Sequence, residues 1–187
     1  MRRFGSLLDW TCAGACIFAA AVPVAADDVS VQVPGGDLVK VVVPAGWKHS
    51  VAQPVPTLPP TLEIQEPTAP LVLKITFLPD PNGKLAKDEE LKKLMKASTG
   101  LYLAGSVEQK LELWPLTTKN GRGVYATFTD ASLLDKKELP PGQFRIVASG
   151  ILLVGKQAAA FTLLTNRLEG KEYEAAMQIL SEGITVP

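Results

Sequence analysis

The segment FRIVASGILLVGKQAAAFTLLTN, residues 144–166, contains two apolar runs joined by a short polar turn. The run from Ile151 to Val154 is unbroken, whereas a half-solvated strand alternates between apolar and polar residues. A tight turn near Lys156 and Gln157 would bring the two runs side by side as antiparallel strands. The segment therefore predicts two neighbouring strands, the first of them covered on both faces.

The residues before this segment predict a further hairpin. The runs 106–118 and 121–133 are rich in strand-forming residues and flank Asn120–Gly121, a strong signal for a two-residue hairpin turn. Pro115 lacks an amide donor, so its strand should lie at a sheet edge or carry a bulge. Residues 134–143, LDKKELPPGQ, predict a polar loop.

The first half of the chain predicts four more strands. Runs at 29–33 and 38–44 surround a Pro-Gly-Gly-Asp turn, and two others cover 61–67 and 69–79. In the last, Leu71, Leu73, Ile75 and Phe77 alternate with more polar residues, which is typical of one buried face. The four prolines within 52–61 predict an extended surface loop, either a stiff connector or a proline-rich ligand.

Two segments have helical spacing. Between about Lys87 and Leu103, a predicted buried stripe comprises Leu91, Leu94, Met95, Ser98, Leu101 and Tyr102. In residues 170–184, Tyr173, Met177, Leu180 and Ile184 form a similar stripe. The chain thus predicts an α+β fold, with one helix mid-chain and one at the C-terminus.

Residues 1–26 have the features of a signal peptide: Arg2 and Arg3, an apolar run to Val22, and small residues before a cut. We expect cleavage after Ala26, leaving one domain at 27–187 without a membrane span in the periplasm or outside the cell. Lipid attachment at Cys16 and a twin-arginine signal are the alternatives, but neither sequence pattern fits well.

Composition excludes several classes of function. The chain has 19 basic and 19 acidic side chains, a balance that disfavours nucleic acid as the main partner. Both cysteines lie in the predicted leader, so a mature chain has no disulfide, thiolate nucleophile or cysteine metal ligand.

Catalytic and metal-binding patterns are also missing. His49 is the only histidine, and its neighbour Ser50 should point to the opposite face of an extended chain. Asp80 and Asn82 lack the further acidic ligands of a calcium loop. Convergence of distant carboxylates remains open for Glu63, Glu66, Glu108 and Glu112. We therefore predict no enzyme activity, cofactor site or metal site.

Three aromatic residues are the candidates for partner binding: Trp47, Trp114 and Tyr125. Trp47 is also interpreted as closing the end of a strand over the core. Trp114 lies beside Pro115 on the predicted edge strand, and for this residue both interpretations stay open.

The segment VVVPAGWK, residues 41–48, and the order of elements resemble the PsbP-like superfamily, over about Leu38 to Ile184. Pro44, Gly46 and Trp47 carry the resemblance. It implies an α/β/α sandwich around a central, mainly antiparallel sheet, in proteins that act mostly as accessory or binding subunits. No catalytic or metal-ligand set can be matched residue by residue.

The predicted function is that of an exported, non-enzymatic accessory or binding protein of the cell envelope, with an envelope protein as partner. It would bind through an edge strand and the proline-rich loops. The alternative is a small-ligand carrier or hydrolase with a pocket between sheet and helix.

Overall fold

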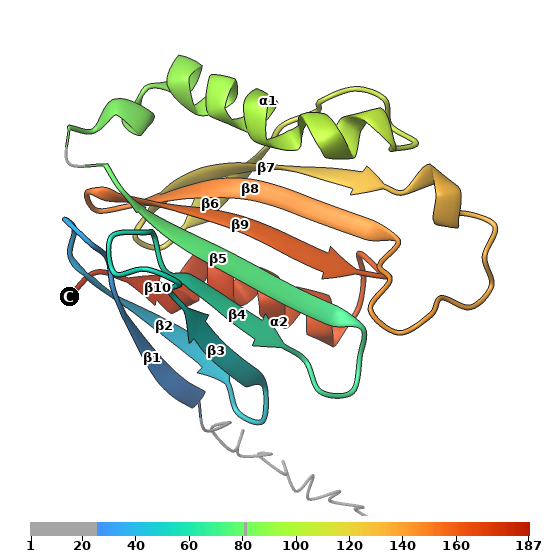
Figure 1. The fold of residues 1–187 in the computed structure, drawn as a ribbon, viewed down its shortest axis with the longest axis horizontal. Helices are drawn as coiled ribbons and strands as arrows, with labels where there is room; N and C mark the ends of the chain where they lie inside the picture. Colours follow the sequence, from blue (N-terminus) through green and yellow to red (C-terminus); the bar gives the residue numbers. More distant parts are fainter. Residues whose placement is uncertain (1–25, 81) are drawn as a thin grey trace, which may run out of the picture.

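The computed structural model describes residues 26–80 and 82–187, and these form two antiparallel sheets and two α-helices (Figure 1). The large sheet contains, in spatial order, β3 (Lys48–Ala52), β4 (Thr61–Gln65), β5 (Leu71–Pro79), β9 (Gln157–Thr165), β8 (Ile146–Val154), β7 (Gly121–Thr129) and β6 (Trp114–Thr118). The small sheet contains β1 (Ala26–Gln32), β2 (Leu38–Pro44) and β10 (Ile184–Thr185), with β2 in the middle.

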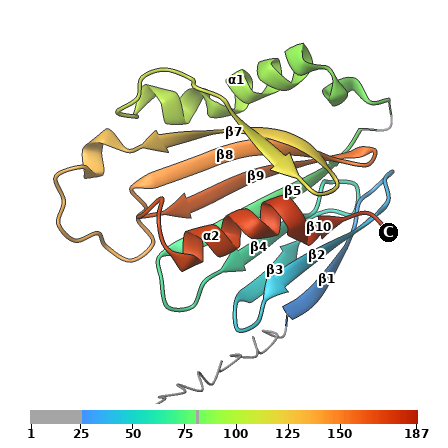
Figure 2. The same cartoon turned by 180° about the vertical axis from the view of Figure 1, so that it is seen from behind.

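The predicted α+β fold class, with its α/β/α sandwich, is wrong. The fold is β-rich, with 43% of the described residues in strands and 22% in helices. One face of the large sheet is covered by α1 (Asp88–Ala104), but the other is covered by the small sheet together with α2 (Lys171–Gln178) (Figures 1 and 2). The prediction failed because the second cover is built mainly from valine-rich strands, and local alternation does not indicate which sheet a strand joins.

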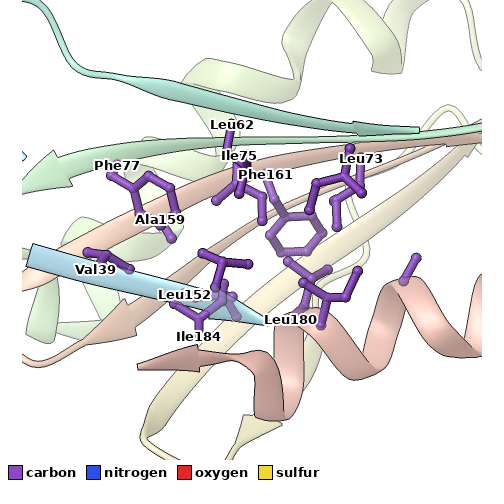
Figure 3. Packing of buried hydrophobic residues seen from close by; sticks show 14 of the residues in the cluster. Val39, Leu62, Leu73, Ile75, Phe77, Leu152, Ala159, Phe161, Leu180 and Ile184 are labelled. Atoms are coloured by element: carbon purple, nitrogen blue, oxygen red, sulfur yellow. The ribbon is translucent and has the colours of Figure 1, made fainter. Parts of the chain in front are cut away.

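The main core lies between the two sheets. Leu73, Ile75 and Phe161 of the large sheet point toward Leu180 and Ile184 in Figure 3. Strand β5 shows the predicted alternation, with its apolar row buried. The small sheet contributes one buried row of valines to the same core: Val29, Val31, Val33, Val39, Val41 and Val43.

Helix α1 covers the opposite face of the large sheet near β7 and β8 (Figure 1). Leu91 and Met95 contact Ile151 and Ala158 in a second core cluster. Strand β8 is therefore covered on both faces, as its unbroken apolar run predicted. The predicted stripe is wrong at the exposed Ser98 and at Leu101, which is 91% exposed, because the buried row follows positions 91, 95 and 99.

The C-terminal segment is less helical than predicted. Helix α2 ends at Gln178, a π-helical turn follows over Ile179–Gly183, and Ile184 already belongs to β10. The turn is fixed to the β6–β7 hairpin, since the Lys119 amide donates to the Ser181 carbonyl (2.7 Å). Within the described residues, no helix is long and apolar enough to cross a membrane.

The β6–β7 hairpin and the edge position of β6 agree with the sequence, but the segment before β6 does not. The β6–β7 hairpin turns at Lys119–Asn120, and β6 is an edge strand, as Pro115 indicated. Residues 106–113 were predicted as strand but precede β6 without regular structure beyond an isolated bridge at Ser106. The predicted leader lies outside the described residues, except for Ala26, which begins β1 opposite Pro44.

Candidate functional site

The large sheet has a free edge at β3. Among the described residues this strand pairs only with β4, in a register that places Ser50 opposite Glu63, and all five of its residues are exposed. The other edge strand, β6, contains Pro115 and therefore lacks one amide donor. Strand β3 contains no proline, so the main-chain groups that do not face β4 remain open to another strand.

A tight turn positions the beginning of β3. Gly46 adopts φ +81°, a conformation that favours glycine, and the Trp47 amide donates to the Pro44 carbonyl (3.2 Å). The half-buried Trp47 side chain packs against the main core. Trp47 therefore anchors the turn that leads from the small sheet into the exposed edge strand, which agrees with its interpretation as a core-closing residue.

The proline-rich loop after β3 is folded back on itself. The Gln53 side-chain amide donates to the carbonyls of Pro56 and Leu58, both at 3.0 Å. The Leu58 amide closes a turn on Val55 (2.9 Å). Val55 and Leu58 are exposed, as is Val51 on the strand itself. The loop is at the surface as predicted, but these hydrogen bonds fold it into turns, so the predicted extended conformation is wrong. It adds apolar side chains to the end of the edge strand.

Strand β4, which pairs with the edge strand β3, has side-chain contacts to β5. The Lys74 ammonium lies 3.0 Å from the Glu63 carboxylate across β4 and β5, and the Gln65 amide also donates to Glu63 (2.6 Å). Hydrogen bonds from these two residues hold the pKa of Glu63 below its usual value, against a smaller effect of burial. In the same strand pair, the hydroxyls of Thr61 and Thr76 are 2.9 Å apart. Strand β4 is thus a fixed support for β3.

The aromatic candidates do not form one surface. Trp114 and Tyr125 lie directly opposite each other on β6 and β7, and Trp114 is 48% exposed. Tyr125 and Tyr173 are half-buried against the main core, and burial, with a smaller effect of Tyr125, raises the pKa of Tyr173. Trp47 precedes β3 at the opposite edge of the sheet.

His49 and the acidic candidates are dispersed. His49 lies exposed on β3 opposite Ile64, and Ser50 follows it on the other face of the sheet. Glu108 instead accepts hydrogen bonds from the amide and hydroxyl of Thr129. In the parts of the chain that the structure describes, no three His, Cys, Asp or Glu side chains are grouped so that they could hold a metal ion.

The sequence did not reveal β3. The sequence predicted a strand that ends near Pro44 and a proline-rich loop over 52–61, and it assigned residues 48–51 to no strand. Pairing with β4 makes them a strand. The only local feature of residues 48–52 compatible with a strand was the absence of glycine and proline.

No protein-family model matches this chain, and a comparison with curated proteins finds no similar sequence. The resemblance to the PsbP-like superfamily therefore stays a prediction, and the sandwich that it implied differs from the observed fold.

Proposed function

We propose that this protein is an exported, non-enzymatic binding protein of the cell envelope, and that it binds an extended segment of an envelope protein along β3. The observation that carries the proposal is the free, proline-free edge formed by Lys48–Ala52, all of it exposed. Export is supported by the signal-peptide pattern of residues 1–26.

Strand addition explains how such an edge binds. The main-chain groups of β3 supply hydrogen bonds, each worth about 0.5–1.5 kcal/mol net. Side chains that alternate along the edge supply selectivity. Val51, followed in the loop by Val55 and Leu58, offers apolar contacts to the partner. Because β4 is held by its ladder with β5 and by the buried Leu62 and Ile64, the strand that pairs with β3 is already ordered before binding.

Site-specific photo-crosslinking tests the proposal. A photoreactive amino acid replaces Ser50 on β3 or, as a matched control, the exposed Thr117 on the opposite edge. With envelope extract, the Ser50 probe should crosslink to one extended segment of a partner, identified by mass spectrometry. The crosslink should be lost in Val51→Glu and retained in Leu101→Glu, which alters an exposed leucine on α1.

The proposal fails if the Ser50 probe captures no partner. It also fails if the Thr117 probe gives the same partner in equal yield, or if Val51→Glu leaves the crosslink unchanged. Both glutamate substitutions replace exposed side chains, so neither should alter folding by more than about 0.5 kcal/mol. Unfolding curves of the two variants check this directly.

A further inference from the structure

A cavity of about 430 Å³ lies at one end of the large sheet, away from the β3 edge. Its walls come from the β4–β5 loop, the β7–β8 loop and the residues that lead into α2, which gather at the same end in both views (Figures 1 and 2). The β4–β5 wall is held by the Glu66 carboxylate, which accepts from the amide (2.6 Å) and hydroxyl of Thr68. The walls are therefore ordered before any ligand arrives.

Arg145 is fixed at this cavity without a counter-ion. Its backbone amide donates to Asn166 Oδ1 (2.8 Å), and its guanidinium donates to the carbonyls of Leu133 (3.3 Å) and Lys136 (2.6 Å). These partners are neutral, and within residues 26–80 and 82–187 Arg145 forms no ion pair. Arg145 is a half-buried residue whose guanidinium is oriented but has no ion pair, so it can accept an anion with little loss of side-chain entropy.

Two further cations line the cavity. Arg167 and Lys137 are exposed at its walls, and neither forms an ion pair in the described part of the chain. The backbone of Arg167 is fixed by the buried Thr165, whose hydroxyl accepts from the Arg167 amide (3.2 Å) and donates to its carbonyl (3.0 Å). The positive side chains therefore converge from two separate loops.

Two carboxylates, those of Glu169 and Glu172, also line the cavity and offset part of its positive charge, but within the described residues they form no ion pair with these cations. The Glu172 carboxylate turns back toward Gly170, where an added Cβ would lie 3.2 Å from Oε2. It thus lies at the N-terminus of its own helix, where the helix dipole favours a negative charge.

Apolar side chains complete the cavity. Leu71 and Pro70 come from the β4–β5 side, Leu139 from the β7–β8 loop, and the half-buried Tyr173 from α2. We infer that this cavity is a binding site for a small organic anion, in which Arg145 holds a phosphate or carboxylate group and the apolar wall contacts a compact apolar or aromatic part. This inference is independent of the proposed docking at β3.

Titration by NMR tests the site with three probes: phenyl phosphate, benzoate and inorganic phosphate. Saturable shifts of the Arg145, Thr165 and Tyr173 amides with either aromatic probe support the inference, and the tighter of the two identifies the preferred anion. Inorganic phosphate should bind more weakly, because it lacks the apolar part. The absence of saturable shifts with all three probes, or shifts that map elsewhere, would overturn it.

Variants separate the site from general charge effects. Arg145→Gln should lower the affinity for the tighter-binding aromatic probe by about tenfold or more, because a charge-assisted hydrogen bond to the anion is lost. Arg122→Gln is the matched control, since Arg122 pairs with Asp88 beside α1 and does not line the cavity. Equal affinity of Arg145→Gln and wild type would refute the inference.

A second variant is needed because Arg145 also holds the β7–β8 loop through its hydrogen bonds to Leu133 and Lys136. If Arg145→Gln loses the native spectrum, Arg167→Gln tests the anion site in its place. This variant should fold, because the Arg167 side chain is exposed and forms no side-chain hydrogen bond among the described residues. We expect about a threefold weakening in this variant, and unchanged affinity would count against the site.

Discussion

The ring of Phe161 on β9 lies directly against the backbone of Gly150, its cross-strand partner on β8. A Cβ on Gly150 would overlap both this ring and the Val124 carbonyl. Phe161 is 2% exposed and belongs to the core between the two sheets (Figure 3). The missing side chain at position 150 thus provides the space for the largest residue of β9 in that core.

Gly150→Ala should destabilise the fold by about 2–3 kcal/mol, because neither the Val124 backbone nor the packed ring can move freely. Urea unfolding measures the loss. The control is Gly100→Ala on α1, where an added Cβ meets nothing within 4 Å. That variant should be neutral or stabilised by up to about 1 kcal/mol, because alanine is the better helix former. Similar losses in both variants would contradict the Phe161 contact as the cause.

Met95→Ala should cost about 2–5 kcal/mol, since Met95 is buried between α1 and β8. Leu101→Ala on the same helix should change stability by less than about 0.5 kcal/mol. Thermal or chemical unfolding of the pair tests which stripe of α1 is buried. A larger loss of stability in Leu101→Ala than in Met95→Ala would show that Leu101 is buried, as the sequence predicted.

Truncation of the two tryptophans near the sheet edges should also affect stability to different extents. Trp47→Ala should cost about 2–3 kcal/mol, because its ring packs on the main core, whereas Trp114→Ala should cost about 1 kcal/mol or less. Denaturant unfolding compares the two variants. If Trp114→Ala were the more damaging, Trp114 and not Trp47 would be the structural residue.

Glu108 should make stability depend on pH. Burial opposes its ionisation, but hydrogen bonds from Thr129, Ser106 and its own amide together lower its pKa below the usual 4.5. A lowered folded-state pKa stabilises the protein above about pH 4.5, and this stabilisation disappears as pH falls through the folded-state value. Glu108→Gln should therefore be less stable than wild type at pH 7, by up to about 1 kcal/mol, because partial exposure to solvent screens the interaction.

Urea unfolding between pH 7 and pH 3 measures this difference, which should shrink toward zero at the acid end. Glu112→Gln is the control, because Glu112 contacts only Lys110 at an exposed position. It should stay within about 0.5 kcal/mol of wild type. A Glu108→Gln difference that is constant with pH would rule out ionisation of Glu108 as its source.

Much of the local structure could be predicted from the sequence, because it depends on neighbouring residues. Helix α1 lies at Asp88–Ala104, and the turn between β8 and β9 lies at Gly155–Lys156, within a residue or so of the predictions. The alternation of β5 was confirmed, and so was a hairpin around Asn120, although its turn lies at Lys119–Asn120 and Gly121 begins β7. In each case, side-chain periodicity or a φ preference acts over a few residues only.

Long-range pairing could not be predicted in this way. Residues 48–52 become a strand because β4 offers hydrogen bonds, and Ile184–Thr185 become β10 because β2 lies beside them. The same holds for the cavity, in which Arg145 and Arg167 meet only when the ends of β8 and β9 are adjacent.

The sequence by itself determined where most strands, helices and turns lie, since these depend on local sterics and the spacing of apolar residues. Only the tertiary structure decided that the strands form two sheets, that β3 is an edge strand, and that one cavity is lined by cations with no ion pair among residues 26–80 and 82–187. Those features depend on which distant segments bury their apolar faces together, and residue periodicity does not specify that choice.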